Sequence, residues 1–319
     1  MDFILACVGL VLLLVAGDAL VRGAVNLSLR VGIPALIVSL TIVAFGTSAP
    51  ELLIAISAIK EGVPGLALGN VIGSNTANVL LVLGIPALVT TLHVTDNSTR
   101  SSYLQMIAAT ALFIGLAGFG AFTWGSGLVL LAALFAMLGY AVYVARCHKR
   151  DATAAFDDSD DLDDLEGADP DMPWWKIIVF LIAGLIGLPL GAELLVNAST
   201  NIARAFGVSD TIIGLTLVAV GTSLPELATT VMAALRKQAD VAFGNVIGSN
   251  MFNLLGIIGV SSLVGDLPVA PELMQFDIWV MLAASLLLGV FVLKRINITR
   301  VWGVAFSVLY VTYIVSVLL

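Results

Sequence analysis

Residues 41–53 read TIVAFGTSAPELL, and residues 216–228 read TLVAVGTSLPELA. A second motif, GNVIGSN, occurs at 69–75 and recurs without change at 244–250. Both motifs recur at the same offset of 175 residues, which carries Glu51 onto Glu226. The chain therefore contains two copies of one unit. Such an internal repeat indicates an architecture built from two similar halves.

The composition places both copies in a membrane. Hydrophobic residues make up 60% of the chain and charged residues 11%, whereas soluble domains carry about 25% charged residues. The apolar residues form long runs with almost no charge, such as 3–14, 108–121 and 128–145. About 20 apolar residues in a helix span a bilayer, and in lipid a helix satisfies its own backbone polar groups. The sequence predicts an all-α integral membrane protein.

Ten transmembrane helices are predicted, five in each copy. The expected spans are 3–23, 34–59, 66–91, 103–122 and 124–146 in the first copy, then 174–203, 210–235, 241–265, 273–293 and 299–318 in the second. Because each copy crosses the membrane an odd number of times, the second begins on the side opposite to the first. The two five-helix repeats are therefore expected to be inverted, an arrangement typical of secondary transporters.

An acidic linker joins the two repeats. Ten of the 22 acidic residues fall between Asp151 and Asp171, and this low-complexity stretch is predicted to be flexible. The expected domains are 1–146 for the first exchange repeat, 147–173 for the linker and 174–319 for the second repeat. With the predicted spans, 12 of the 14 lysines and arginines lie on the linker's side of the membrane. The positive-inside rule makes that side cytoplasmic and puts both termini outside.

Glu51 and Glu226 are the residues that point to a function. Each lies deep in an apolar span, in the phrase G-T-S-x-P-E. A carboxylate near the bilayer centre costs a few kcal/mol or more unless a partner, a proton or a cation compensates it. Two of them at equivalent inverted positions indicate one shared site near the midplane. Pro50 and Pro225 lack an N–H and are expected to break the helix there, which frees carbonyl oxygens.

Further oxygen-bearing side chains flank the two glutamates at helical spacing. They are Thr47, Ser48, Ser74 and Asn78 in the first repeat, and Thr222, Ser223, Ser249 and Asn253 in the second. An all-oxygen set without histidine or cysteine favours a hard cation, and calcium takes six to eight oxygens. The simpler interpretation of each phrase is a proline kink with serines bonded to the backbone, but the duplication favours an ion site.

Other polar and small residues of the repeats leave two interpretations open. Asn70, Asn75, Asn245 and Asn250 either line a path or form hydrogen bonds between helices. Gly69, Gly73, Gly244 and Gly248 form small-xxx-small patterns and are expected to allow close helix packing. Asp18 and Glu193 are also equivalent positions near helix ends, and Arg22 lies one turn from Asp18. We expect a structural ion pair or an interfacial carboxylate there rather than a gate.

The charge of the site predicts exchange rather than leak. Two glutamates balance one Ca²⁺ or two Na⁺, so that either loaded form can reorient, whereas the empty site carries uncompensated charge. Protons are an alternative counter-ion at the same carboxylates. A channel or an intramembrane hydrolase fits less well, since the inverted repeats favour alternating access and the sequence lacks a GxGD motif. The chain is therefore interpreted as a transporter and not an enzyme, with no cofactor and no nucleic-acid partner.

The motifs GTSxPE and GNxxGSN resemble the alpha-repeats of the cation/calcium exchanger superfamily, over nearly the whole chain except the linker. The chain is most similar to the prokaryotic calcium/sodium antiporter branch, which implies the plasma (inner) membrane, transport of Ca²⁺ and Na⁺, and sliding of the first and sixth helices. The resemblance also adds the backbone carbonyls of Ala44 and Ala219 to the ligand set. Some sodium/calcium exchangers have an aspartate where this chain has Asn253, which leaves coupling to K⁺ or H⁺ open.

Overall fold

The computed structural model describes residues 1–94, 97–154, 169, 171–207 and 219–318, and these residues are mostly helical. The first half contains the helices α1 (Asp2–Val31), α2 (Ala35–Val38), η1 (Ser39–Val43, a π-helix), α3 (Ala44–Thr47), α4 (Ala49–Lys60), α5 (Pro64–Leu80), α6 (Gly84–Val89), α7 (Asn97–Ala117) and α8 (Trp124–Ala154).

The second half follows a similar order. It contains α9 (Trp174–Ala205), α11 (Ala219–Gly221), α12 (Leu224–Leu235), α13 (Ala239–Met251), the π-helix η3 (Phe252–Ile257), α14 (Ile258–Val264), the π-helix η4 (Leu273–Asp277), α15 (Ile278–Lys294) and α16 (Arg300–Leu318). Two short antiparallel strands, β1 (Ala121–Phe122) and β2 (Leu267–Pro268), join the two halves at one edge.

Seven helices among the described residues are long and apolar enough to cross a membrane, or eight if the bent pair 35–47 and 49–60 is one span. The helical membrane protein predicted from composition is thus confirmed, while the number ten remains a prediction. The predicted span 210–235 lies partly outside the described residues. The helices differ from the predicted spans mainly in length: α1 continues to Val31, α8 continues to Ala154, and α7 runs from Asn97 to Ala117 rather than from 103 to 122.

The helices that carry the GNVIGSN motifs lie at the centre of the molecule. In the spans 64–89 and 239–264, 78% and 89% of the most apolar window is buried, against 22% for α8 and 17% for α16. Polar side chains in a membrane are tolerated mainly where protein surrounds them. The two central spans are therefore the places where the polar motif residues can be accommodated.

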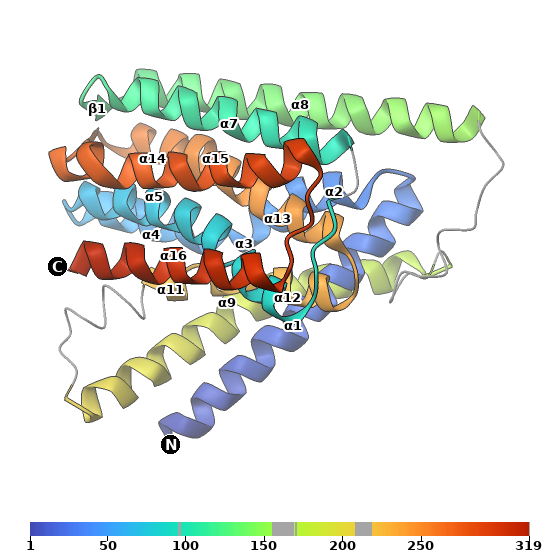
Figure 1. The fold of residues 1–319 in the computed structure, drawn as a ribbon, viewed down its shortest axis with the longest axis horizontal. Coiled ribbons are helices and arrows are strands. Elements are labelled where there is room, and N and C mark those ends of the chain that lie inside the picture. Colours follow the sequence, from blue (N-terminus) through green and yellow to red (C-terminus); the bar gives the residue numbers. More distant parts are fainter. Residues whose placement is uncertain (95–96, 155–168, 170, 208–218, 319) are drawn as a thin grey trace.

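α1 and α9 run side by side and cross the other helices obliquely (Figure 1). Glycines allow this close approach. A Cβ added at Gly9 would lie 2.7 Å from the backbone nitrogen of Leu195, and one at Gly191 would lie 2.9 Å from that of Leu13. Because a side chain at these positions would separate the backbones, the two long helices depend on small residues for their contact.

Gly244 and Gly248 have the packing role predicted for them. A Cβ at Gly244 would lie 2.7 Å from the carbonyl oxygen of Leu36, and one at Gly248 would lie 2.5 Å from that of Leu40. These glycines therefore let α13 pack directly on α2 and η1. Gly69 and Gly73 are their equivalents in the first repeat, and the residues that would face them, 211 and 215, lie outside the described residues.

We expect Gly248→Ala to lower the melting temperature of the purified protein. The added methyl group would meet a backbone oxygen that cannot move alone, and overpacking of this kind costs about 1–3 kcal/mol. Gly139→Ala in α8 is the matched control, since a Cβ there has no atom within 4 Å and alanine favours a helix. Equal melting temperatures for the two variants would contradict the packing role.

Candidate cation site

Both GTSxPE phrases end one helix and begin another. In the first repeat α3 ends at Thr47 and α4 begins at Ala49, with a 40° bend between the two halves of the span. Ser48 lies at the break with φ −85° and ψ 2°. Ser223 has nearly the same backbone, φ −89° and ψ 5°, before α12. The predicted break is thus confirmed in the first repeat; in the second, residues 208–218 are outside the described residues.

The break places each glutamate in the first turn of a 12-residue helix. Pro50 and Pro225 occupy the second positions of α4 and α12, and Glu51 and Glu226 follow them. Proline is well tolerated there because its missing N–H would have no helical partner. The positive end of the helix dipole stabilises a carboxylate in the same turn, which offsets part of the desolvation of these side chains.

Glu51 and Glu226 are both buried inside the protein, away from bulk water. Glu51 is 1% exposed and Glu226 is 0% exposed. The Ser48 hydroxyl donates a hydrogen bond to Glu226 Oε1 across 3.2 Å, and Glu51 follows Ser48 by three residues in the first turn of α4. The phrases of the two repeats therefore meet directly, with a serine of one touching the glutamate of the other.

Seven buried oxygen atoms on the predicted ligands have no hydrogen-bond partner among the described residues. These atoms are Glu51 Oε1 and Oε2, Glu226 Oε2, Ser74 Oγ, Asn78 Oδ1, Ser223 Oγ and Asn253 Oδ1. All of them belong to side chains that the sequence analysis predicted as ligands. Buried polar groups in proteins nearly always have partners, and each one left alone costs about 1–3 kcal/mol. A cation bound by these oxygens would remove that penalty.

Thr47, Ser249 and Thr222 are engaged in hydrogen bonds between helices. The Thr47 hydroxyl lies 3.3 Å from Asn245 Oδ1 and 3.4 Å from the Ser249 hydroxyl. The Thr222 hydroxyl donates to Asn70 Oδ1 across 3.4 Å. These bonds favour the interpretation of Asn70 and Asn245 as interhelical hydrogen-bonding residues over that of a path lining.

The two predicted carbonyl ligands have different standing. The Ala44 carbonyl, which the resemblance implies as a ligand, accepts bonds from the Ser48 amide at 3.1 Å and the Thr47 hydroxyl at 3.3 Å. A carbonyl oxygen has two lone pairs, so Ala44 would have to exchange one of these donors for a cation to act as a ligand. Ala219 begins α11, at the edge of the undescribed segment. Its role stays a prediction.

Asp18 forms the structural ion pair that the sequence indicated. Its Oδ2 lies 2.9 Å from Arg22 Nε, and its Oδ1 accepts a bond from Arg236 Nε. Arg236, which follows α12, was not predicted as a partner because it lies far away in sequence. The equivalent Glu193 is exposed and lines a cavity of about 470 Å³ that also contacts Pro50 and Thr222.

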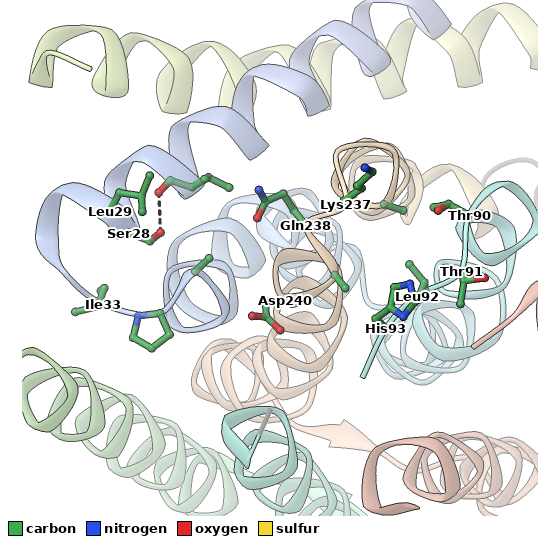
Figure 2. Close-up of a pocket in the computed structure, with 15 residues that line it drawn as sticks. Ser28, Leu29, Ile33, Thr90, Thr91, Leu92, His93, Lys237, Gln238 and Asp240 are labelled. Atoms are coloured by element: carbon green, nitrogen blue, oxygen red, sulfur yellow. Dashed lines mark hydrogen bonds between the residues drawn. The ribbon is translucent and has the colours of Figure 1, made fainter. Parts of the chain in front are cut away.

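A cavity of about 600 Å³ lies apart from the candidate ligands (Figure 2). It is bordered by the end of α1, the segment from Thr90 to His93, and the corner between α12 and α13, where Lys237, Gln238 and Asp240 lie. None of the predicted ligands lines it. The candidate site is therefore formed by the buried oxygens between the helices and not by this cavity. Within the described residues no group of three or more His, Cys, Asp or Glu side chains that could hold a metal ion occurs. The candidate site itself contains two carboxylates.

Comparison with known proteins identifies the family of this chain. The family model described as "Sodium/calcium exchanger protein" matches residues 1–145 and 176–319. The chain belongs to the sodium/calcium exchanger family. It is 33% identical over 353 residues to sodium/calcium exchanger MaX1 of Methanosarcina acetivorans, which covers 98% of this chain and 97% of the relative. It is therefore a membrane exchanger, a transporter and not an enzyme.

Two further comparisons concern a relative named as a membrane protein and a solved three-dimensional structure. The exchanger is 33% identical over 291 residues to inner membrane protein YrbG of Escherichia coli K12, covering 91% of this chain and 88% of the relative. A solved structure of the sodium-calcium exchanger NCX_Mj, soaked with Na⁺ and Sr²⁺, superposes with a TM-score of 0.82 at 32% identity, covering 98% of this chain and 97% of that one.

Proposed function

We propose that this exchanger moves Ca²⁺ in one direction and Na⁺ in the other by alternating access at a site formed by Glu51 and Glu226. The observation that carries the proposal is the set of buried, unpartnered oxygens on side chains of both repeats, including three carboxylate oxygens. The proposed ligands are all oxygen atoms, which suits Ca²⁺ and Na⁺ rather than a soft metal. The relatives named as sodium/calcium exchangers support the same pair of ions.

The proposed ligand set is the one predicted from the sequence. It comprises the side chains of Thr47, Ser48, Glu51, Ser74, Asn78, Thr222, Ser223, Glu226, Ser249 and Asn253 and the carbonyls of Ala44 and Ala219. The two carboxylates neutralise one Ca²⁺ or two Na⁺, and the desolvation cost of a charged, empty site opposes its reorientation. This difference between loaded and empty forms would couple the two fluxes.

The proposed topology consists of ten helices in two inverted repeats, 1–146 and 174–319, with the acidic linker 147–173 and the positive loops in the cytoplasm. The distribution of 12 cationic residues against two supports it. Accessibility of single cysteines placed near residue 1 and in the linker, probed with a membrane-impermeant thiol reagent on intact cells, would test it. Labelling of the linker, or no labelling at the terminus, would contradict the proposed orientation.

The function is tested by calcium uptake into vesicles that contain the purified exchanger. Vesicles loaded with Na⁺ and diluted into Na⁺-free medium with Ca²⁺ should accumulate Ca²⁺, and a sodium ionophore should abolish the uptake. Separate proton and potassium gradients distinguish the alternatives. Uptake that follows a pH gradient and ignores Na⁺ would assign a proton/calcium antiporter, and uptake by Na⁺ that requires K⁺ would assign a potassium-dependent exchanger.

A further inference from the structure

Two hydrogen bonds between asparagines link the repeats in a symmetrical way. Asn78 donates from Nδ2 to Asn250 Oδ1 across 3.1 Å, and Asn253 donates from Nδ2 to Asn75 Oδ1 across 3.4 Å. The offset of 175 residues converts one pair into the other. Each of the four side chains is at most 2% exposed, so water cannot replace these bonds. Each bond joins a proposed ligand of one repeat to a motif asparagine of the other.

The other end of each ligand amide points elsewhere. Asn78 Oδ1 and Asn253 Oδ1 are buried and have no hydrogen-bond partner among the described residues. The oxygen and nitrogen of an amide diverge from one carbon atom, so a partner that holds Nδ2 directs Oδ1 away from itself. In both repeats, therefore, the bond to the second asparagine leaves an amide oxygen available on the ligand.

The orientation of this amide decides whether the side chain attracts or repels a cation. Asn can rotate by half a turn with little change of shape, and it would then present the positively polarised NH₂ group. We propose that Asn75 and Asn250 are positioning residues that hold the oxygens of Asn253 and Asn78 toward the transported cation. This inference rests on the proposed function, and it deepens it by naming residues that act on the ion only through the ligands.

A further contact of Asn250 supports its acceptor role. Asn250 Nδ2 lies 3.6 Å from the sulfur of Met106, so its own amide is held with the oxygen free to accept from Asn78. Asn75 Nδ2 has no partner among the described residues, so the orientation of Asn75 rests on the bond that its Oδ1 accepts from Asn253. Loss of a group that orients a metal ligand typically weakens metal binding about 10- to 100-fold, and we expect a loss of this size for Asn75→Leu and Asn250→Leu.

Double-mutant cycles on calcium binding test the proposal. Calcium affinity of the purified exchanger is measured by titration calorimetry for Asn75→Leu, Asn253→Ala and the double variant. If Asn75 acts only through Asn253, then Asn75→Leu changes the affinity of the Asn253→Ala protein by no more than about twofold. The crossed pair, Asn75→Leu with Asn78→Ala, is the matched control, and its effects should multiply.

Each other result contradicts a definite part of the argument. An equal loss from Asn75→Leu with and without Asn253, or the same coupling in the crossed pair, would assign Asn75 a general structural role and overturn the inference. The symmetry-related cycle on Asn250 and Asn78 provides the test if a variant of Asn75 does not fold. Wild-type protein that binds neither Ca²⁺ nor Na⁺ would instead contradict the proposed function, and the inference with it.

Discussion

Replacing Glu51 or Glu226 by glutamine is expected to abolish sodium-driven calcium uptake. The change keeps the size of each side chain but removes one of two charges and replaces a carboxylate oxygen by an amide NH₂ group. At an effective dielectric constant of about 20, a divalent ion about 4 Å from one carboxylate gains about 8 kcal/mol. Even a fifth of this energy weakens binding by about tenfold. Uptake of Ca²⁺ into Na⁺-loaded vesicles measures the effect.

Two variants control for changes unrelated to the ion. Glu226→Asp keeps the charge on a shorter side chain and should retain measurable uptake with weaker affinity. Glu61→Gln removes an exposed carboxylate at the end of α4 and should leave uptake unchanged. The glutamine variants should also melt no lower than the wild type without Ca²⁺, because a buried charge has been removed. Wild-type uptake by either glutamine variant would exclude a site that depends on both carboxylates.

Much of the candidate site could be predicted from the sequence because its motif occurs in both repeats. A single T-S-x-P-E phrase predicts a kink, but its recurrence with Glu51 and Glu226 in register predicted that the two carboxylates meet, and Ser48 does contact Glu226. The physical basis is simple, since apolar surroundings make every buried polar residue conspicuous. The break at Ser48 was likewise predictable from Pro50, which cannot donate a helical hydrogen bond.

Contacts between distant residues could not be predicted in the same way. The pairing of Arg236 with Asp18 depends on how α1 crosses α12, and no periodicity encodes it. The extension of α1 to Val31 was missed because the apolar run ends earlier. Gly32 was the sequence signal for the true end of the helix. It ends α1 with φ 73°, a left-handed conformation that glycine adopts without the steric cost of a Cβ atom. The hydrogen bonds between asparagines could not be predicted from the repeat alone, because they also depend on how α5 packs on α13.

Binding of Ca²⁺ is expected to raise the melting temperature of the purified wild-type protein, and to leave Glu51→Gln and Glu226→Gln unchanged. The folded protein brings oxygens of two repeats to one ion, whereas the unfolded chain keeps them apart. A ligand bound only to the folded state stabilises it by about 2.7 kcal/mol at 100 times its dissociation constant. Thermal unfolding in detergent at rising Ca²⁺ concentration measures the effect without any transport step.

Sodium should oppose this stabilisation by competing for the same two carboxylates. If two Na⁺ replace one Ca²⁺, a tenfold rise in Na⁺ concentration raises the Ca²⁺ needed for a given shift by about a hundredfold. Choline at the same ionic strength is the control, because it screens charge but is too large for a site between packed helices. A calcium shift that Na⁺ and choline reduce equally would mean that Na⁺ acts only by screening, and exchange at one shared site would then be excluded.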